Sequence, residues 1–122
     1  MTRILYVDDE ADIREVASMS LELDPEFQVR VCSSGEEALG VAAEWQPALI
    51  LLDVMMPRMD GPATFARLRE QPETANTPVV FITARTQAKE VEGFMALGAR
   101  GVIGKPFDPL SLSARVREHL SK

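Results

Sequence analysis

One short apolar run constrains the fold of this chain more than any other stretch. Residues 48–53 read Ala-Leu-Ile-Leu-Leu-Asp, and turn-forming residues follow at Pro57 and at positions 60–62. An apolar run of this length that is closed by turn residues is typical of a strand buried on both faces of a sheet. The run brings one carboxylate, that of Asp53, to the carboxyl end of the strand, where open parallel α/β sheets bind their ligands. A charge in this position needs water or a partner charge.

The rest of the chain alternates between strand and helix patterns. The other expected strands cover residues 3–7, 27–32, 78–82 and 100–103, and the expected helices cover about 13–21, 35–45, 61–70, 87–97 and 109–120. Five strand–helix units in strict alternation predict a parallel sheet, doubly wound with five helices on its two faces and joined by right-handed crossovers. Because the first and third strands both end in acids, we expect them to be neighbours in a flavodoxin-like α/β sheet of order 2-1-3-4-5.

Several helix ends are marked by capping residues. Ser34 with Glu37 three residues later fits a capping box at the start of the second helix. Gly98 stands where a glycine ends a helix in a left-handed conformation. Asp108 followed by Pro109 is typical of the first residues of a helix. These signals predict that the fourth helix ends just before residue 98 and that the fifth begins at 109.

Composition and charge exclude several functional classes. The 122 residues suffice for one domain with a real core, expected to cover 1–122. The net charge of −6 argues against a nucleic-acid partner, which would require a basic stripe. No apolar run reaches the roughly 18 to 20 residues of a membrane span, and the early first strand leaves no room for a signal peptide. The single cysteine, Cys32, suits a reducing compartment. We expect a cytoplasmic protein without membrane insertion.

Chemically matched side chains stand at the ends of four strands. Asp8 and Asp9 follow the first strand, Asp53 ends the third, Thr83 ends the fourth and Lys105 follows the fifth. In the order 2-1-3-4-5 these four strands are adjacent, so we expect the side chains to meet in one cleft. Three carboxylates about 4–5 Å apart would repel by several kcal/mol per pair at an effective dielectric of roughly 20. Such a cluster needs a cation, and oxygen ligands favour Mg²⁺ or Mn²⁺.

Each of these residues also has an ordinary explanation when it is taken alone. Asp8, Asp9 and Glu10 could form a solvated entry to the first helix, and Lys105 could be a surface cation. We favour the functional interpretation because all four adjacent strand ends carry matched groups in the same chain.

Four motifs resemble the receiver domain of two-component response regulators, in particular its single-domain, chemotaxis-regulator-like members. They occur in the family's order and spacing across essentially the whole chain: Val7-Asp8-Asp9-Glu10, Leu52-Asp53-Val54-Met55-Met56-Pro57-Arg58-Met59-Asp60-Gly61, Ile82-Thr83-Ala84 and Lys105-Pro106-Phe107. As a set these motifs are highly specific. The resemblance implies a phosphoprotein in signal transduction that catalyses only its own phosphorylation and dephosphorylation, and is not a turnover enzyme.

The resemblance also implies a role for each acid. Asp53 would be the phospho-acceptor, attacking a phosphohistidine on a sensor histidine kinase or a histidine phosphotransfer protein. Asp9, Asp53 and the backbone carbonyl of Met55 would coordinate Mg²⁺, while Asp8 would act mainly through water. The domain would then signal to a downstream protein target.

The remaining motif residues would support and read out the phosphoryl group. Lys105 would offset its charge, and the Thr83 hydroxyl would donate a hydrogen bond to it. The small side chain of Ala84 would leave room for the loop to close. The resemblance further implies a cis peptide bond between Lys105 and Pro106.

A surface formed by the fourth helix, fifth strand and fifth helix would change with phosphorylation, by the same resemblance. The sequence offers Val91, Met95, Val102 and Leu112 there. Val102 departs from the family, which usually has an aromatic residue three positions before the lysine. A β-branched side chain has little χ1 freedom, so the aromatic half of the family's switch is in doubt.

Two other classes of function compete with this interpretation. A flavodoxin-like cofactor binder would need a Gly/Ser/Thr-rich phosphate cradle after the first strand, where this chain has Asp8 and Asp9. A Mg²⁺-dependent phosphatase would need a second acid two residues after Asp53, where Met55 stands. Since the five units use up the chain, we expect no effector domain, and either a stand-alone receiver or a piece of a larger regulator.

Overall fold

A single parallel sheet organises the computed structural model, which describes residues 1–121. Its strand order is β2-β1-β3-β4-β5, so the predicted order 2-1-3-4-5 is confirmed. The strands are β1 (Thr2–Val7), β2 (Phe27–Cys32), β3 (Leu49–Asp53), β4 (Val79–Thr83) and β5 (Gly101–Gly104). All four pairings are parallel. The predicted central strand β3 is buried at all five positions, because it has a neighbour on each side and helices above and below.

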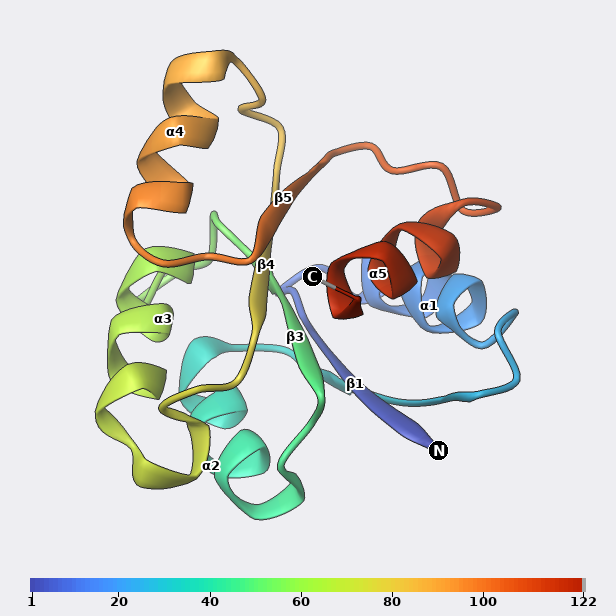
Figure 1. Ribbon diagram of the computed structural model, residues 1–122, viewed down its shortest axis with the longest axis horizontal. Coiled ribbons are helices and arrows are strands. Elements are labelled where there is room, and N and C mark those ends of the chain that lie inside the picture. The colour runs from blue at the N-terminus through green and yellow to red at the C-terminus, as the bar shows by residue number, and fades with distance from the viewer. Residues whose placement is uncertain (122) are drawn as a thin grey trace.

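Helices cover both faces of the sheet, as predicted. They are α1 (Ala11–Leu21), α2 (Gly35–Trp45), α3 (Gly61–Glu70), α4 (Ala88–Ala96) and α5 (Leu112–Leu120), with a short 3₁₀ helix, η1 (Pro72–Thr74), before β4. Figure 1 shows α1 and α5 side by side on one face, and α2, α3 and α4 on the other. Within residues 1–121, none of these helices combines the length and the apolar character that a membrane crossing requires.

Two apolar cores follow from the alternation of side chains along β1. Ile4 and Tyr6 point to the core under α1 and α5, whereas Leu5 and Val7 point to the core under α2 and α3. The hydrophobic residues of β1 from position 4 onward are fully buried. Because β1 leaves this core directly into Asp8, the first acid of the predicted site starts from a rigid support.

Two of the predicted helix ends have the expected capping bonds. The Ser34 Oγ accepts a hydrogen bond from the Glu37 N–H at 3.1 Å, as predicted, whereas Glu37 Oε1 accepts from the Ser33 N–H at 2.6 Å in place of the Ser34 N–H that a capping box uses. Gly98 has φ of 107°, and its N–H donates to the Met95 carbonyl at 3.0 Å. A left-handed residue is needed at this position, which is why glycine ends α4.

The predicted start of the last helix is wrong by three residues, since α5 begins at Leu112 and not at Pro109. Asp108 does accept from the Leu110 N–H at 3.0 Å, as a capping residue would. Its carbonyl, however, accepts from the Ser111 N–H at 3.1 Å, which closes a tight turn of four residues, 108–111. The helical bonding begins only with the Arg115 N–H, which donates to the Ser111 carbonyl at 3.1 Å.

The strand β2 lies at an edge of the sheet, and only its first and last residues are buried. Cys32 closes the strand as a buried free cysteine. Burial raises the pKa of its thiol to about 12, so it acts as a small apolar side chain rather than a nucleophile.

Candidate functional site

The carboxyl ends of β1 and β3 and the loop after β5 meet at one edge of the sheet. Lys105 Nζ lies 3.0 Å from Asp8 Oδ2 and 3.1 Å from Asp53 Oδ1. Asp8 is fully buried and Asp53 is 4% exposed. Because β1 and β3 are direct neighbours, with Val7 opposite Leu52, their following acids are brought into the reach of a single lysine. The structure therefore joins three residues that the sequence placed at separate strand ends.

Asp9 completes an acidic cluster with the two buried carboxylates. Asp8, Asp9 and Asp53 each offer one carboxylate oxygen, and these oxygens lie within 4.8 Å of one another. Asp9 is exposed, so a hydrated ion can approach the cluster from solvent. A set of carboxylate oxygens at this spacing fits a hard divalent cation that keeps several waters. The donor set present thus suits Mg²⁺ or Mn²⁺ and lacks the nitrogen or sulfur ligands that zinc prefers.

Asp8 is held by more bonds than the sequence indicates. Its Oδ1 accepts from the Glu10 N–H at 3.0 Å, and its Oδ2 accepts from the Tyr6 hydroxyl at 3.1 Å in addition to the Lys105 ammonium. Tyr6 lies within the predicted first strand, and none of the four motifs includes it, so this contact was not predicted. The available signal was that residues two apart on a strand share a face, so the one polar ring of β1 points the same way as Asp8.

The pKa values reflect the burial of this cluster. Burial, reinforced by the charge of Asp8, raises the pKa of Asp53 to about 6, although Lys105 pulls in the opposite direction. Burial alone would lower the pKa of Lys105, but its bonds to Asp8 and Asp53 outweigh this effect and raise it. The lysine is therefore charged at neutral pH, and the carboxylate form of Asp53 is less favourable in this buried cluster than in water, so further positive charge would stabilise it.

We expect this raised pKa to make the fold less stable as pH rises from about 4 to 6. In this window the folded Asp53 (pKa about 6) retains a proton that the unfolded one, at about 3.9, has lost, so the free energy of unfolding falls with pH. Asp53→Asn removes the titration. We expect the free energy of unfolding of the variant, measured by urea unfolding in EDTA, to rise relative to that of the wild type by about 2 kcal/mol between pH 4 and 7. A difference between the two proteins that does not change with pH would contradict this.

Thr83 lies at the end of β4, next to the β3 strand that carries Asp53. It is buried, and its Oγ1 accepts from the Arg85 N–H at 2.9 Å. Because the oxygen accepts in this bond, the hydroxyl proton is still available for a ligand oxygen. Ala84, the next residue, is exposed and adds no bulk at the mouth of the site.

A glycine allows α3 to begin against the backbone of the acid-bearing strand. A Cβ at Gly61 would lie 2.6 Å from the Asp53 carbonyl oxygen and 2.8 Å from the Val54 Cα. The Gly61 N–H also donates to the Val54 carbonyl at 2.8 Å. Any side chain at this position would push apart the backbone that supports Asp53.

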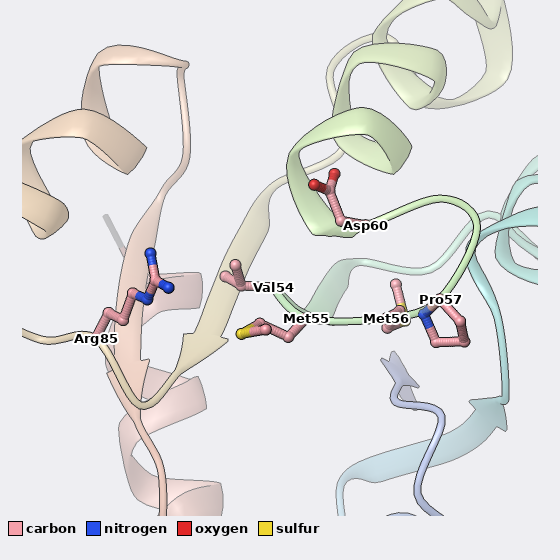
Figure 2. A pocket seen from close by; sticks show the side chains of 6 residues that line it. All are labelled: Val54, Met55, Met56, Pro57, Asp60 and Arg85. Carbon is pink, nitrogen blue, oxygen red and sulfur yellow. The ribbon is translucent and has the colours of Figure 1, made fainter.

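An open cleft of about 540 Å³ extends from the loop after β3. Figure 2 shows its lining, with Arg85 across from Met55 and with Asp60 at the start of α3. Met55 is 68% exposed. The group of this residue that is predicted to bind the cation is its backbone carbonyl, not its side chain. The cleft is bordered by the loop that directly follows Asp53.

One residue predicted for the surface of α4, β5 and α5 is misplaced. Leu112 is fully buried in the core under α5 and offers nothing to a partner, because its helix presents that side to the sheet. Met95 is 43% exposed, and Val91 and Val102 are half-buried. We call the surface formed by Val91, Met95 and Val102 the switch face. The Lys105–Pro106 peptide bond is cis, as the resemblance implies.

The family model and the similar proteins that match this chain all indicate the same family. Residues 4–117 match the family model for the response regulator receiver domain. Response regulator Rre1 of Synechocystis sp. is 37% identical over 120 residues, which cover 98% of this chain and 52% of that protein. Transcriptional regulatory protein SrrA of Staphylococcus aureus is 41% identical over 120 residues, covering 98% and 48%.

Solved structures agree with these sequence matches. The structure of the chemotaxis response regulator CheY4 of Vibrio cholerae is similar to this fold with a TM-score of 0.89 at 32% identity, covering 98% of both chains. A response regulator from Desulfuromonas acetoxidans has a TM-score of 0.87 at 31% identity, covering 99% of this chain and 98% of that one. The chain spans about half the length of the curated relatives that it matches, Rre1 and SrrA among them.

Proposed function

This chain belongs to the response regulator receiver domain family, and from that membership we propose that Asp53 accepts a phosphoryl group from a phosphohistidine of a partner protein. Receiver domains are signalling domains of two-component systems. The observation that carries the assignment to Asp53 is its position: it ends the buried central strand β3, with Lys105 3.1 Å away and the carboxylates of Asp8 and Asp9 beside it. Such a position combines a nucleophile with groups that offset charge.

The transfer requires only groups that the site and the donor supply. A carboxylate oxygen of Asp53 attacks the phosphorus and forms a P–O bond, while the P–N bond to the donor imidazole breaks. The bonding pair returns to the imidazole nitrogen, and because the other ring nitrogen of the donor carries a proton, the histidine leaves neutral. In the hydrolysis that restores Asp53, a water oxygen attacks the phosphorus, the P–O bond to Asp53 breaks with its electron pair returning to the carboxylate, and inorganic phosphate leaves with the protons of the water. The domain thus promotes its own phosphorylation and dephosphorylation without turning over another substrate.

We assign the divalent cation to the carboxylates of Asp9 and Asp53 and the backbone carbonyl of Met55, with Asp8 acting through water. Mg²⁺ suits this oxygen set, and Mn²⁺ is a possible substitute. When bound, the ion neutralises charge on the phosphoryl oxygens during transfer. Lys105 would supply a second positive charge beside the acids, and Thr83 would donate its hydroxyl proton to a phosphoryl oxygen.

Phosphorylation would change the switch face through Thr83 and the loop that follows it. A phosphoryl group adds a dianion with strong acceptors, and this creates the differential contact that a two-state surface needs. Thr83 moves toward the new acceptor, Ala84 gives the loop space, and Pro106 keeps Lys105 in place beside it. Val102 offers no ring to swing, so we propose that the readout relies on the loop and the exposed Met95 of α4.

The partners that we propose are a sensor histidine kinase or a histidine phosphotransfer protein upstream and a protein target downstream, all in the cytoplasm. The relatives Rre1 and SrrA are about twice as long as this chain, so an output domain or a separate target protein would read the switch face. The acidic charge of −6 gives no support to direct contact with nucleic acid.

Acetyl phosphate with Mg²⁺ should phosphorylate the chain once, on a bond that hydroxylamine cleaves, as expected for an acyl phosphate. Phosphorylated histidine kinases from the same genome should transfer label to it, and EDTA should prevent both reactions. Intact-protein mass spectrometry measures the stoichiometry. Steady multiple turnover of a phosphoester would favour the phosphatase alternative instead, and a tight yellow complex with FMN would favour the flavodoxin-like one.

A further inference from the structure

We propose that Tyr6 is a positioning residue of the phospho-acceptor site, whose hydroxyl holds the Asp8 carboxylate in the orientation that serves the divalent cation. The inference rests on the proposed function, which assigns Asp8 a role but gives none to Tyr6. It starts from one contact: the Tyr6 hydroxyl donates to Asp8 Oδ2 at 3.1 Å, and both residues are fully buried.

The two carboxylate oxygens of Asp8 accept from different donors. Oδ2 accepts from Tyr6 and from the Lys105 ammonium, whereas Oδ1 accepts from the Glu10 N–H at 3.0 Å. A carboxylate has about four acceptor positions, so the position left open belongs to Oδ1. The Tyr6 bond therefore selects the oxygen of Asp8 that remains for a cation or its water.

The Tyr6 bond matters more once a phosphoryl group is attached to Asp53. Lys105 bridges Asp8 and Asp53 in the free domain, and its ammonium is the group that we expect to turn toward the phosphoryl oxygens. Asp8 Oδ2 then loses its charged donor although Asp8 is fully buried, and a buried acceptor that has no partner is costly. Tyr6 remains as its donor, which keeps Asp8 in place through the reaction.

The ring of Tyr6 is anchored independently of its hydroxyl. It packs in the core under α1 and α5 and meets the Phe107 ring edge-on, with centroids 6.5 Å apart at 71°. A phenylalanine would fill the same space and keep this contact. The hydroxyl can therefore be removed with little effect on packing, which separates positioning from a structural role.

Tyr6→Phe in the full chain tests the proposal through metal binding rather than phosphorylation. Electron paramagnetic resonance of free Mn²⁺ measures the affinity, and we expect about tenfold weaker binding in the variant, as for other groups that orient a metal-site carboxylate. Ser20→Ala is the matched control, because it removes another buried hydroxyl, which donates to the Val16 carbonyl at 2.7 Å away from the acids. It should bind Mn²⁺ as the wild type does.

A spectroscopic arm needs no substitution. The chain has one tyrosine and one tryptophan, so ¹³C label at the tyrosine Cζ gives a single signal that reports the Tyr6 hydroxyl. Mg²⁺ should shift this signal along the binding curve. The Trp45 indole signal should stay unchanged, because this ring lies beside Arg3 at the start of β1.

Each outcome has one consequence. Equal Mn²⁺ affinity of wild type and Tyr6→Phe, or a Cζ signal that Mg²⁺ leaves in place, would overturn the role of Tyr6 while the proposed function stands. If the wild type binds no divalent cation at all, the proposed function itself fails. A tenfold loss in the variant together with the Cζ shift supports the proposal.

Discussion

Asp53→Asn is expected to abolish phosphorylation by acetyl phosphate and Mg²⁺ completely. Asparagine has the size of aspartate, but its amide is a poor nucleophile and cannot form an acyl phosphate. The other acids do not replace Asp53: Asp8 is fully buried with both oxygens hydrogen-bonded, and Asp9 is exposed, away from the buried position that Lys105 contacts. Intact-protein mass spectrometry after a short incubation measures the loss, which should exceed about 100-fold in rate.

The matched control is Asp24→Asn. Asp24 lies between α1 and β2, at the opposite end of the strands, where it pairs with Arg117. This variant should be phosphorylated at the wild-type rate, since the substitution removes the same charge without touching the site. Label that persists on another residue of the Asp53→Asn chain would contradict the assignment of the acceptor.

Lys105→Ala is expected to leave the fold intact and to slow phosphorylation by about 100-fold, the typical effect of losing one group that stabilises the transition state. Lys105 contacts both Asp8 and Asp53, so its removal takes away the one side-chain cation, within residues 1–121, that bridges these acids. Alanine cannot reach the transferred group, while water can enter the space that the lysine leaves.

Two measurements separate these effects of Lys105→Ala. Rates of acetyl phosphate labelling report the transfer, and amide NMR spectra with and without phosphorylation report the structural response. Lys89→Ala, which removes an exposed lysine of α4, is the control and should label normally. A phosphorylated Lys105→Ala chain whose spectrum differs from the free form as much as that of the wild type does would show that the lysine has no part in the response.

Much of the architecture was predictable because it depends on local patterns. The apolar run at 48–53 is short, lacks polar positions and ends in turn residues, so it can only be buried on both faces, and β3 is. The strict alternation of strands and helices left few topologies, and acids at the ends of two strands indicated the pair that had to be adjacent. Ser34 and Gly98 marked helix ends correctly, because capping acts over three or four residues.

The predictions were wrong where two local signals compete for the same residues, or where packing decides which side of a helix is buried. Asp108 forms a capping bond, but a four-residue turn closes first, and α5 therefore starts at Leu112. Leu112 was expected on the surface formed by α4, β5 and α5, and the packing of α5 against the sheet buries it in the core instead. Gly61 was seen as a turn residue, while its need for close backbone approach depends on where α3 meets β3.

By itself the sequence determined the sheet, the order of its strands and which residue types stand at each strand end, because hydrophobic periodicity and turn chemistry act along the chain. Only the tertiary structure decided which oxygen of Asp8 each donor takes, that Lys105 reaches two acids at once, and that Tyr6 belongs to the site. These features depend on distances of about 3 Å between residues from separate strands. Such distances follow from packing in three dimensions, which no pattern along the chain contains.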